Sequence, residues 1–267
     1  MALAPAGDAM FAVGAGKFAR INLDPARPSL RTALETAISG AAHIALVPSG
    51  RRAWVTRPDN AASDHANSRV SEVDADPNSA TYGQVLGDVA LPGYLPSGIT
   101  IAATGQLAYV SDQSSDRVLE LNIDPAAAGS FRTLLREIKV PTALLSGGIV
   151  LDPHGRSLYV GTDNLGLLAI DLAVDPPTAT TLAATAVGAG VAVTPSGGRV
   201  LAVEGGASAH RVVYRDVSPG TGSGLVPVGG EPRAIQVSPG GATAFVVNSQ
   251  FAQLQVLDVT QATPTRR

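Results

Sequence analysis

The stretch Ser238–Asp258, SPGGATAFVVNSQFAQLQVLD, combines a Pro-Gly-Gly turn with an apolar strand and a second apolar strand that ends on an acid. Pro fixes φ at the first position of a turn and Gly accepts positive φ further on, so the phrase predicts a hairpin corner. A small-residue turn with glycine, followed by an apolar strand, occurs six times, and Pro stands two residues before the glycine in all but the turn at Gly105. The glycines are Gly7, Gly50, Gly105, Gly155, Gly197 and Gly241, which are 43, 55, 50, 42 and 44 residues apart. A period of about 40–50 residues carrying short strands predicts a β-propeller with one blade per repeat.

Each repeat has room for four strands. Four residues after the glycine stands a bulky apolar residue, which we expect to pack between blades: Phe11, Trp54, Tyr109, Tyr159, Leu201 and Phe245. A strand then ends on an acid or amide: Asp24, Asp74, Asn122, Asp171, Asp216 and Asp258. An apolar inner strand precedes each turn (43–47, 98–102, 148–151, 190–193, 234–237), and a more polar outer strand follows the acid (82–91, 131–140, 180–187). The pattern predicts an all-β fold of four-stranded antiparallel blades.

Two segments, 29–38 and 130–140, also have the local propensity of short helices. They share the phrase Ser-Leu/Phe-Arg-Thr. Their place in the repeat favours outer strands, because outer strands tolerate charge and weak β propensity. We therefore predict strands in both segments.

The repeats lie near 1–40, 41–93, 94–143, 144–187, 188–230 and 231–267, and they predict one propeller domain over 1–267. The first repeat is short of its inner strand, since Ala2–Gly7 resembles Ala45–Gly50, and the last is short of a full outer strand. Two arrangements agree with this: an incomplete seven-bladed disc, or a six-bladed disc that closes imperfectly.

Composition limits the function classes. Charged residues make up 15% and the net charge is −3, with no basic stripe, so nucleic acid is not expected as a partner. No apolar run is long enough to span a membrane. The chain has no Cys, which excludes disulfides and thiolate chemistry. Residues 1–10 lack a basic start and an apolar core, so we do not expect them to be a signal peptide.

Three local motifs resemble ligand sites. Asp74–Asn78 (DADPN) resembles the start of a calcium loop but lacks its later Gly and Glu. Asp-Pro also follows strand ends at Asp24, Asp124 and Asp175, so turn-forming Asp side chains are the preferred reading. Gly14–Lys17 lacks the remainder of a phosphate loop, and 220–224 is a glycine-rich connector. We therefore expect no metal and no cofactor.

Polar side chains could still gather at one mouth of the central channel. The candidates are His43, His65 and His210 with Asp59, Asp64, Asp112, Asp163 and Glu204, whereas His154 lies in a hairpin turn. Polar loops are expected at that place in any propeller, so solvated loops are the preferred reading and no residue is assigned a catalytic role. The second repeat also carries an insertion, Pro58–Asn67, between its second and third strands, and longer loops are common places for function.

Several repeats resemble the Tyr-Val-Thr-Asn signature of the YVTN β-propeller repeat family: Phe245–Asn248, Tyr109–Asp112, Tyr159–Thr162 and Trp54–Thr56. Repeats one and five depart from it, at Phe11–Gly14 and Leu201–Glu204. Such repeats occur in prokaryotic surface-layer and secreted proteins, and they are similar to the propellers of lactonases and quinoprotein amine dehydrogenases. The family has no shared catalytic residue.

The resemblance implies a non-enzymatic scaffold, one that binds a protein or a small polar ligand at one face of the disc. It implies a place outside the cell, on the cell surface or in the periplasm. The alternative is a lactonase-like hydrolase with His, Asp, Glu and Arg at the channel mouth acting as general base and oxyanion stabiliser.

Overall fold

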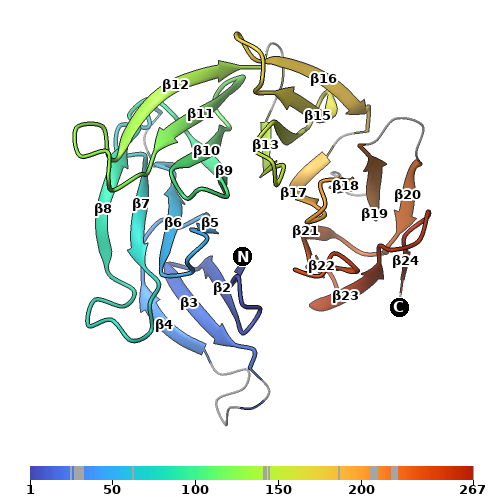
Figure 1. Cartoon of the computed structure of the whole chain (residues 1–267), viewed down its shortest axis with the longest axis horizontal. Coiled ribbons are helices and arrows are strands. Elements are labelled where there is room, and N and C mark those ends of the chain that lie inside the picture. The colour runs from blue at the N-terminus through green and yellow to red at the C-terminus, as the bar shows by residue number, and fades with distance from the viewer. Residues whose placement is uncertain are drawn as a thin grey trace. The chain divides into compact units, whose positions relative to one another are not determined.

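The computed structural model describes residues 1–24, 26, 33–61, 63–140, 143, 145–185, 187–204, 210–217 and 222–266, without the side chains of 146 and 189. Its strands form six four-stranded antiparallel sheets, which we call blades 1 to 6 in chain order (Figure 1). The predicted all-β propeller of four-stranded blades is confirmed, and the chain itself forms six blades.

The backbone contacts separate the chain into two compact units, which are described one at a time. Unit 1 comprises Met1–Ser114 and Val118–Glu137, and unit 2 comprises Ser115–Arg117 and Ile138–Arg267.

Unit 1 contains blades 1 and 2 and nearly all of blade 3. Blade 1 is β1 (Ala2–Leu3), β2 (Ala9–Gly14), β3 (Lys17–Asn22) and β4 (Ala33–Ala37). Blade 2 is β5 (His43–Leu46), β6 (Arg52–Arg57), β7 (Arg69–Asp74) and β8 (Val85–Ala90). Blade 3 is β9 (Pro96–Ile101), β10 (Leu107–Asp112), β11 (Arg117–Asn122) and β12 (Thr133–Lys139).

Unit 2 contains blades 4 to 6. Blade 4 is β13 (Leu145–Leu151), β14 (Ser157–Thr162), β15 (Gly166–Asp171) and β16 (Thr178–Ala183). Blade 5 is β17 (Val187–Val193), β18 (Arg199–Glu204), β19 (Arg211–Asp216) and β20 (Ser223–Pro227). Blade 6 is β21 (Pro232–Val237), β22 (Thr243–Asn248), β23 (Gln253–Asp258) and β24 (Thr265–Arg266).

Blades stack through both faces of their middle strands. In β6, Ala53 and Val55 join the apolar cluster shared with blade 1, whereas Trp54 joins the cluster shared with blade 3. In β18, Leu201 and Val203 pack with blade 6, whereas Val200 packs with blade 4. Successive strand residues point to opposite faces, so two packed faces require a continuous apolar run. The predicted packing role of the bulky residue after the turn is confirmed at five positions, all at most 5% exposed, while Phe245 is only half-buried.

The glycine turns also interlock from blade to blade. A Cβ built on Gly50 would lie 3.3 Å from Cδ of Pro5, and one on Gly105 would lie 3.2 Å from Cδ of Pro48. In unit 2 a Cβ on Gly241 would lie 3.3 Å from Cδ of Pro195. These glycines have φ between 69° and 74°, which favours glycine. Each is therefore needed for its own backbone conformation and also for the close approach of the proline from the turn of the preceding blade.

Four inner strands begin two or three residues earlier than predicted. A β-bulge after the first pair explains the difference: in β13, Leu145 pairs with Thr162, but the next pair is Ile149 with Val160. Similar register shifts occur at the start of β9, β17 and β21. The outer strand predicted at 180–187 is shifted for the same reason, because Val187 already belongs to β17.

The outer strands are otherwise as expected. Segments 82–91 and 131–140 contain β8 and β12, and strand is the correct reading for 33–37 and 133–139. Residues 29–32 lie outside the described part of the chain.

The acids and amides at the strand ends form turns, as predicted. Their side-chain oxygens accept the backbone N–H two residues on, at 2.8–3.0 Å: Asp24 to Ala26, Asp74 to Asp76, Asn122 to Asp124, Asp171 to Ala173, and Asp258 to Thr260. In blade 1 the last strand residue is Asn22 rather than Asp24, and Asn22 makes the same bond to Asp24. This Asx geometry lets a polar side chain end a strand without leaving a buried donor unpaired.

Candidate functional surface

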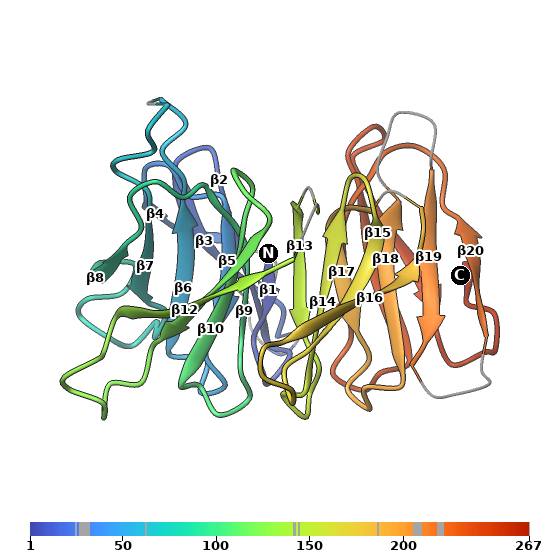
Figure 2. The ribbon, with the colours of Figure 1, turned by 90° about the horizontal axis from the view of Figure 1, so that it is seen from above.

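The longest connection between the second and third strands of any described blade is Pro58–Ser68, between β6 and β7. The equivalent connections in blades 1, 3, 4 and 6 have two to four residues, so the predicted insertion is present. Figure 2 shows the loop projecting beyond the end of blade 2, in the blue-green part of the colour scale. Residues 60, 61, 63, 64, 66 and 67 are exposed.

This insertion loop is ordered by its own hydrogen bonds, most of which meet at Asp59. One carboxylate oxygen accepts the N–H of Ala61 at 3.1 Å, and the other accepts the backbone and side-chain N–H groups of Asn67, both at 3.1 Å. The carbonyl of Asp59 contacts Nδ1 of His65 at 2.9 Å, and its N–H donates to Oγ of Ser68 at 2.8 Å. These bonds fix the arrangement of the described residues of the loop, 58–61 and 63–68.

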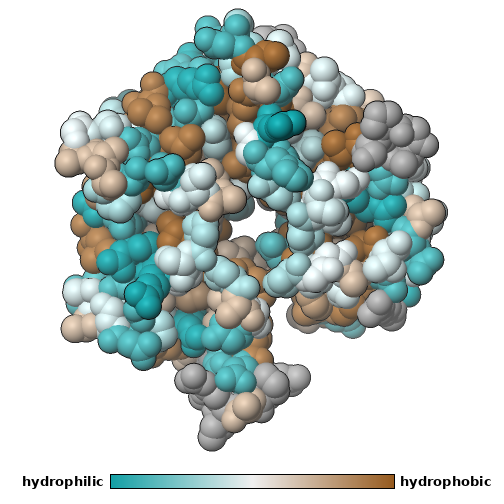
Figure 3. All heavy atoms as spheres, in the orientation of Figure 1, coloured by the Kyte–Doolittle hydropathy of each residue, from teal (hydrophilic) through white to brown (hydrophobic). Residues whose placement is uncertain are grey.

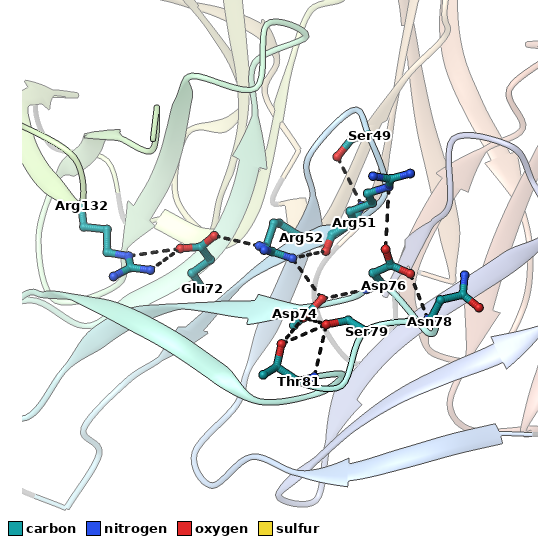
Figure 4. Close-up of polar contacts among 10 residues, drawn as sticks. All are labelled: Ser49, Arg51, Arg52, Glu72, Asp74, Asp76, Asn78, Ser79, Thr81 and Arg132. Carbon is teal, nitrogen blue, oxygen red and sulfur yellow. Dashed lines mark hydrogen bonds and ion pairs between the residues drawn. The ribbon is translucent and has the colours of Figure 1, made fainter. Parts of the chain in front are cut away.

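The opposite end of blade 2 carries a chain of ion pairs that the sequence did not predict (Figure 4). Glu72, on β7, accepts Nε and Nη2 of Arg132 at 3.1 and 2.6 Å and lies 3.3 Å from Nε of Arg52. Arg52 also donates to Asp74 at 3.0 Å. Arg132 comes from the β11–β12 connection, so the chain ties blade 3 to blade 2 within unit 1.

Arg132 reaches Glu72 by lying across β8. A Cβ on Gly87 would overlap its guanidinium, and the guanidinium carbon stands 4.6 Å above the Phe131 ring. The residue adopts φ of 60°, which is rare for a side-chain-bearing residue. In the sequence, the only sign of this ion pair is the glycine at position 87, which leaves room for the guanidinium of Arg132. That sign can be interpreted only when blades 2 and 3 are known to be neighbours.

The DADPN motif belongs to the same end of blade 2. Asp74 is 1% exposed and accepts Oγ of Ser79 at 2.6 Å and Oγ1 of Thr81 at 2.5 Å, besides the bonds to Asp76 and Arg52. Despite the opposing effect of burial, these hydroxyl and N–H donors and the Arg52 charge hold the pKa of Asp74 below its usual value. Its oxygens are thus engaged with protein donors in a turn, as the preferred reading of the motif requires.

The histidines of the proposed mouth cluster lie in different settings. His65 is in the insertion loop of unit 1, and His210 precedes β19 in unit 2, where its Nδ1 contacts the carbonyl of Gly230. His154 lies in the β13–β14 turn, with Nδ1 3.0 Å from Oδ1 of Asp152. Each ring nitrogen named here is held by a partner from its own unit. Solvated loops stay the preferred reading of these positions, and a catalytic cluster stays the untested alternative.

His43 is the first residue of β5. Burial, and secondly the nearby amino terminus, lower its pKa to about 4. Its backbone N–H donates to Oγ1 of Thr56 at 3.0 Å. The imidazole is therefore neutral at pH 7, part of the packing at the start of an inner strand.

Besides Asp59, the acids Asp112 and Glu204 of the proposed mouth have several structural partners each. Asp112 is fully buried, and its Oδ1 accepts the N–H of Leu95 at 2.7 Å and both the N–H and Oγ of Ser114, at 3.0 and 2.7 Å. Glu204 forms a two-bond ion pair with Arg211, at 2.6 and 3.0 Å. Asp64 and Asp163 are exposed.

The remaining motifs are turns or lie partly outside the described residues. Gly14–Lys17 is the β2–β3 hairpin, with Gly14 paired to Lys17 and no helix after it. In the connector 220–224, residues 220 and 221 are not described, and Ser223 begins β20.

Two open cavities lie in unit 2. One, of about 340 Å³, is bordered by the β17–β18 turn, Arg199, Asp216 and Thr260. Arg199 is saturated there: it binds both oxygens of Asp216, at 2.5 and 3.0 Å, and donates to the carbonyls of Val259, Gln261 and Ala262. The other, of about 460 Å³, is bordered by Arg156, Asp171 and Thr178. Arg199 therefore holds the segment after β23 against blade 5, and it has no N–H group left for a ligand in the first cavity.

Within the described residues, no group of three or more His, Cys, Asp or Glu side chains is placed to hold a metal ion. In that same part of the chain, no helix has the length and apolar character needed to cross a bilayer.

Comparison with protein-family models and with curated proteins finds no match. Solved structures do resemble the chain. A chain in the crystal structure of a nidogen/laminin complex has a TM-score of 0.72 and 16% identity, over 96% of this chain and 90% of that one. Hydrazine synthase of Kuenenia stuttgartiensis gives 0.70 and 19%, over 96% and 75%. The Cps50 (Swd1) β-propeller domain of Myceliophteria thermophila gives 0.68 and 15%, over 97% and 82%.

These likenesses establish the propeller fold. At such identities they do not transfer an activity, and the assignment to the YVTN family stays a prediction.

Proposed function

We propose that this chain is a protein-binding propeller whose insertion loop, Pro58–Ser68, contacts the partner. The observation that carries the proposal is the ordering of the loop around Asp59. A loop held in one conformation loses less entropy on binding than a mobile one, so its exposed groups are suited to recognition. A structural relative comes from a nidogen/laminin complex, which agrees with a role in protein assembly.

The expected interface is polar. The exposed positions of the loop are Asn60, Ala61, Ser63, Asp64, Ala66 and Asn67, which offer hydrogen-bonding groups and one carboxylate that takes no part in the Asp59 network. Away from the loop, the face of the molecule drawn in Figure 3 also mixes hydrophilic and neutral surface with separate apolar patches. We therefore expect a partner that supplies amide or hydroxyl groups and a cation opposite Asp64, and we expect the complex to form outside the cell or in the periplasm.

The experiment compares three purified proteins as baits. They are the native chain, a variant in which 58–68 is replaced by Gln-Ser-Ser-Asp, the β10–β11 turn of blade 3, and Asp163→Ala as control. Asp163 is an exposed acid in an equivalent turn of blade 4. Retained proteins are quantified by mass spectrometry, and each candidate is then purified and titrated by calorimetry. We expect a partner that binds the native and Asp163→Ala proteins at least tenfold more tightly than the trimmed variant.

A second variant, Asp59→Ala, separates loop order from loop composition. It keeps every exposed side chain but removes the acceptor that organises them, so it should weaken the same complex. Equal retention and equal affinity for native and trimmed proteins would exclude the loop as the binding surface.

A further inference from the structure

The second open cavity of unit 2 lies on the face of blade 4 that is turned towards blade 5. Its volume is about 460 Å³, and the residues along its border include Arg156, Ser157, Ala169, Asp171, Thr178 and Thr180. Tyr159 pairs with Ala169, and both belong to the apolar cluster that blade 4 shares with blade 5. Paired residues share a face of a sheet, so the cavity continues this packed face outward.

The cavity lacks an arginine that two other blades have at the same place. Two residues after the turn glycine, blades 2 and 5 carry Arg52 and Arg199. Each of them forms an ion pair with the acid that ends the third strand, at 3.0 and 2.5 Å. Blade 4 has Ser157 at this position, paired with the strand-ending Asp171. The acid of the repeat is therefore present in blade 4, but its guanidinium partner is not.

The cavity also lacks a large side chain. On the third strand, the residue paired with the bulky residue after the turn is Glu72 in blade 2 and Tyr214 in blade 5, but Ala169 in blade 4. Figure 4 shows how Glu72 and Arg52 occupy this part of blade 2. Because blade 4 has a serine and an alanine instead, it leaves space for an incoming side chain beside an acid.

Asp171 is free to bind a cation there. One of its oxygens, Oδ1, accepts the N–H of Ala173 at 2.8 Å, and among the described residues the carboxylate forms no ion pair. Arg156 borders the cavity without supplying this charge. Its equivalent in blade 2 is Arg51, which lies 3.8 Å from Asp76 rather than beside the strand-ending acid, and blade 4 has Ala173 where blade 2 has Asp76.

The strand beside the cavity is suited to pairing with a further strand. β16 is the outermost strand of blade 4 (Figure 1), and Thr178–Thr181 are exposed. Of the described outer strands with five or more residues, only β16 has neither a charged residue nor a proline. The others contain Glu35 in β4, Asp88 in β8, Arg136, Glu137 and Lys139 in β12, and Pro227 in β20. An exposed, uncharged edge is a template for strand addition.

The register identifies which backbone groups of β16 are open. The N–H of Leu172 donates to the carbonyl of the residue before β14 at 2.8 Å, which marks a bonded pair. Bonded and non-bonded partners alternate along a strand, so the preceding residue, Asp171, bonds to β16 through its partner Thr178. Ala179 and Thr181 then direct their N–H and C=O groups outward. The register shift of β16 lies beyond Thr181.

A strand added to this edge turns alternate side chains towards the cavity. The residue opposite Thr178 shares a face with Thr178 and Asp171, and two strand spacings, roughly 9–10 Å, separate it from Asp171. An arginine can span such a gap in this fold, because Arg132 lies across β8 and binds Glu72 at 3.1 and 2.6 Å. β16 contains no basic residue, so a second copy paired through its own β16 would not supply the cation.

We propose that blade 4 binds an extended segment of a partner protein, which pairs antiparallel with β16 at Thr178–Thr181 and places an arginine opposite Thr178. The guanidinium enters the cavity and binds Asp171, in the place that Arg52 and Arg199 take in blades 2 and 5. The site lies in unit 2 and is independent of the insertion loop of unit 1, so loss of binding at one surface leaves the other intact.

The test uses the peptide acetyl-Thr-Thr-Val-Thr-Arg-Thr-amide and amide hydrogen exchange by NMR on the full chain. In the free protein, the amides of Ala179 and Thr181 should exchange fast and those of Thr178 and Thr180 slowly. At a peptide concentration about ten times Kd, exchange at Ala179 and Thr181 should slow by about tenfold, because only the unbound fraction exchanges. A peptide with citrulline, the uncharged analogue of arginine, should bind about three- to fivefold more weakly, as expected for an exposed ion pair.

Two substitutions test the cavity itself. Ser157→Arg gives blade 4 the arginine of blades 2 and 5, which should pair with Asp171, occupy the cavity and remove the preference for the arginine peptide over the citrulline peptide. Asp171→Asn keeps the oxygen that accepts the Ala173 N–H but loses the charge, so it should remove the same preference. Asp163→Asn, at an exposed acid in the β14–β15 turn, should keep it.

Three results would overturn the proposal: no slowing of exchange up to the solubility limit, equal affinity of the native protein for the two peptides, or an undiminished arginine preference in Ser157→Arg. Slow exchange at Ala179 and Thr181 without peptide, together with the mass of a dimer, would show that a second copy covers the edge and would also overturn it.

Discussion

Replacing Gly105 by Ala tests whether the contact between a turn glycine and the proline of the neighbouring turn holds adjacent blades together. The φ of 74° costs an alanine about 1–2 kcal/mol, and its Cβ would lie 3.2 Å from Cδ of Pro48. Ordinary carbon contacts are at about 3.5–4.0 Å, so the turn must shift by a few tenths of an ångström, which costs about 1 kcal/mol more. Gly7→Ala is the matched control, because Gly7 has φ of 72° in the equivalent turn and no described atom within 4 Å.

Urea denaturation followed by Trp54 fluorescence measures the loss. Trp54 is the single tryptophan, 1% exposed in blade 2, so it reports on unit 1. We expect Gly105→Ala to lower the free energy of unfolding by about 2–3 kcal/mol and Gly7→Ala by about 1–2 kcal/mol. In a Pro48→Ala background the excess at Gly105 should vanish, as a double-mutant cycle would show. Equal losses for the two glycine variants, or an excess that persists without Pro48, would refute the interlocking role.

Two further substitutions, one in each unit, test how a titratable or charged side chain contributes to stability. The pKa of His43 is lowered to about 4, so its neutral form contributes stability that is complete above pH 6.5 and is lost as pH falls toward 4. The loss is on the order of 3 kcal/mol at most. In urea titrations, the free energy of unfolding of His43→Gln should fall less steeply with decreasing pH than that of the native protein, and an equally steep fall would contradict the lowered pKa. In unit 2, Arg199→Met removes five hydrogen bonds, leaves Asp216 without its guanidinium and should raise the lowered pKa of that acid. It should cost about 3–5 kcal/mol and speed amide exchange at Thr265, whereas intact protection there would show that the segment is held by other contacts.

The propeller could be predicted from the sequence because its evidence is local and repeated. Each Pro-x-Gly turn and each acid at a strand end acts within a few residues, as the Asp74 and Asn122 turns do. The six-fold repetition then made the blade boundaries visible. The bulges at the inner strands could not be predicted, because a register shift such as that between Leu145 and Ile149 depends on the partner strand.

The candidate surfaces were harder to predict, since their meaning depends on which blades are adjacent. Asp112 looked like a channel-mouth acid, yet its carboxylate is used to fix the loop before β9. Arg132 looked like an ordinary outer-strand residue, yet it pairs with Glu72, which is 60 residues away in the sequence. In a repeat fold, equivalent positions can pack in one blade and form a long-range ion pair in the next. The role of a polar residue can therefore be inferred only when its partner is known.

The proposed binding surface in blade 2 follows from a departure from the repeat rather than from the repeat itself. Blade 2 has an eleven-residue loop where the equivalent connections of blades 1, 3, 4 and 6 have two to four residues, and that loop carries its own ordering acceptor, Asp59. A regular blade satisfies its backbone and apolar groups against its neighbours, so little remains for a partner to recognise. A blade with an insertion presents an extra surface, and binding free energy is available there.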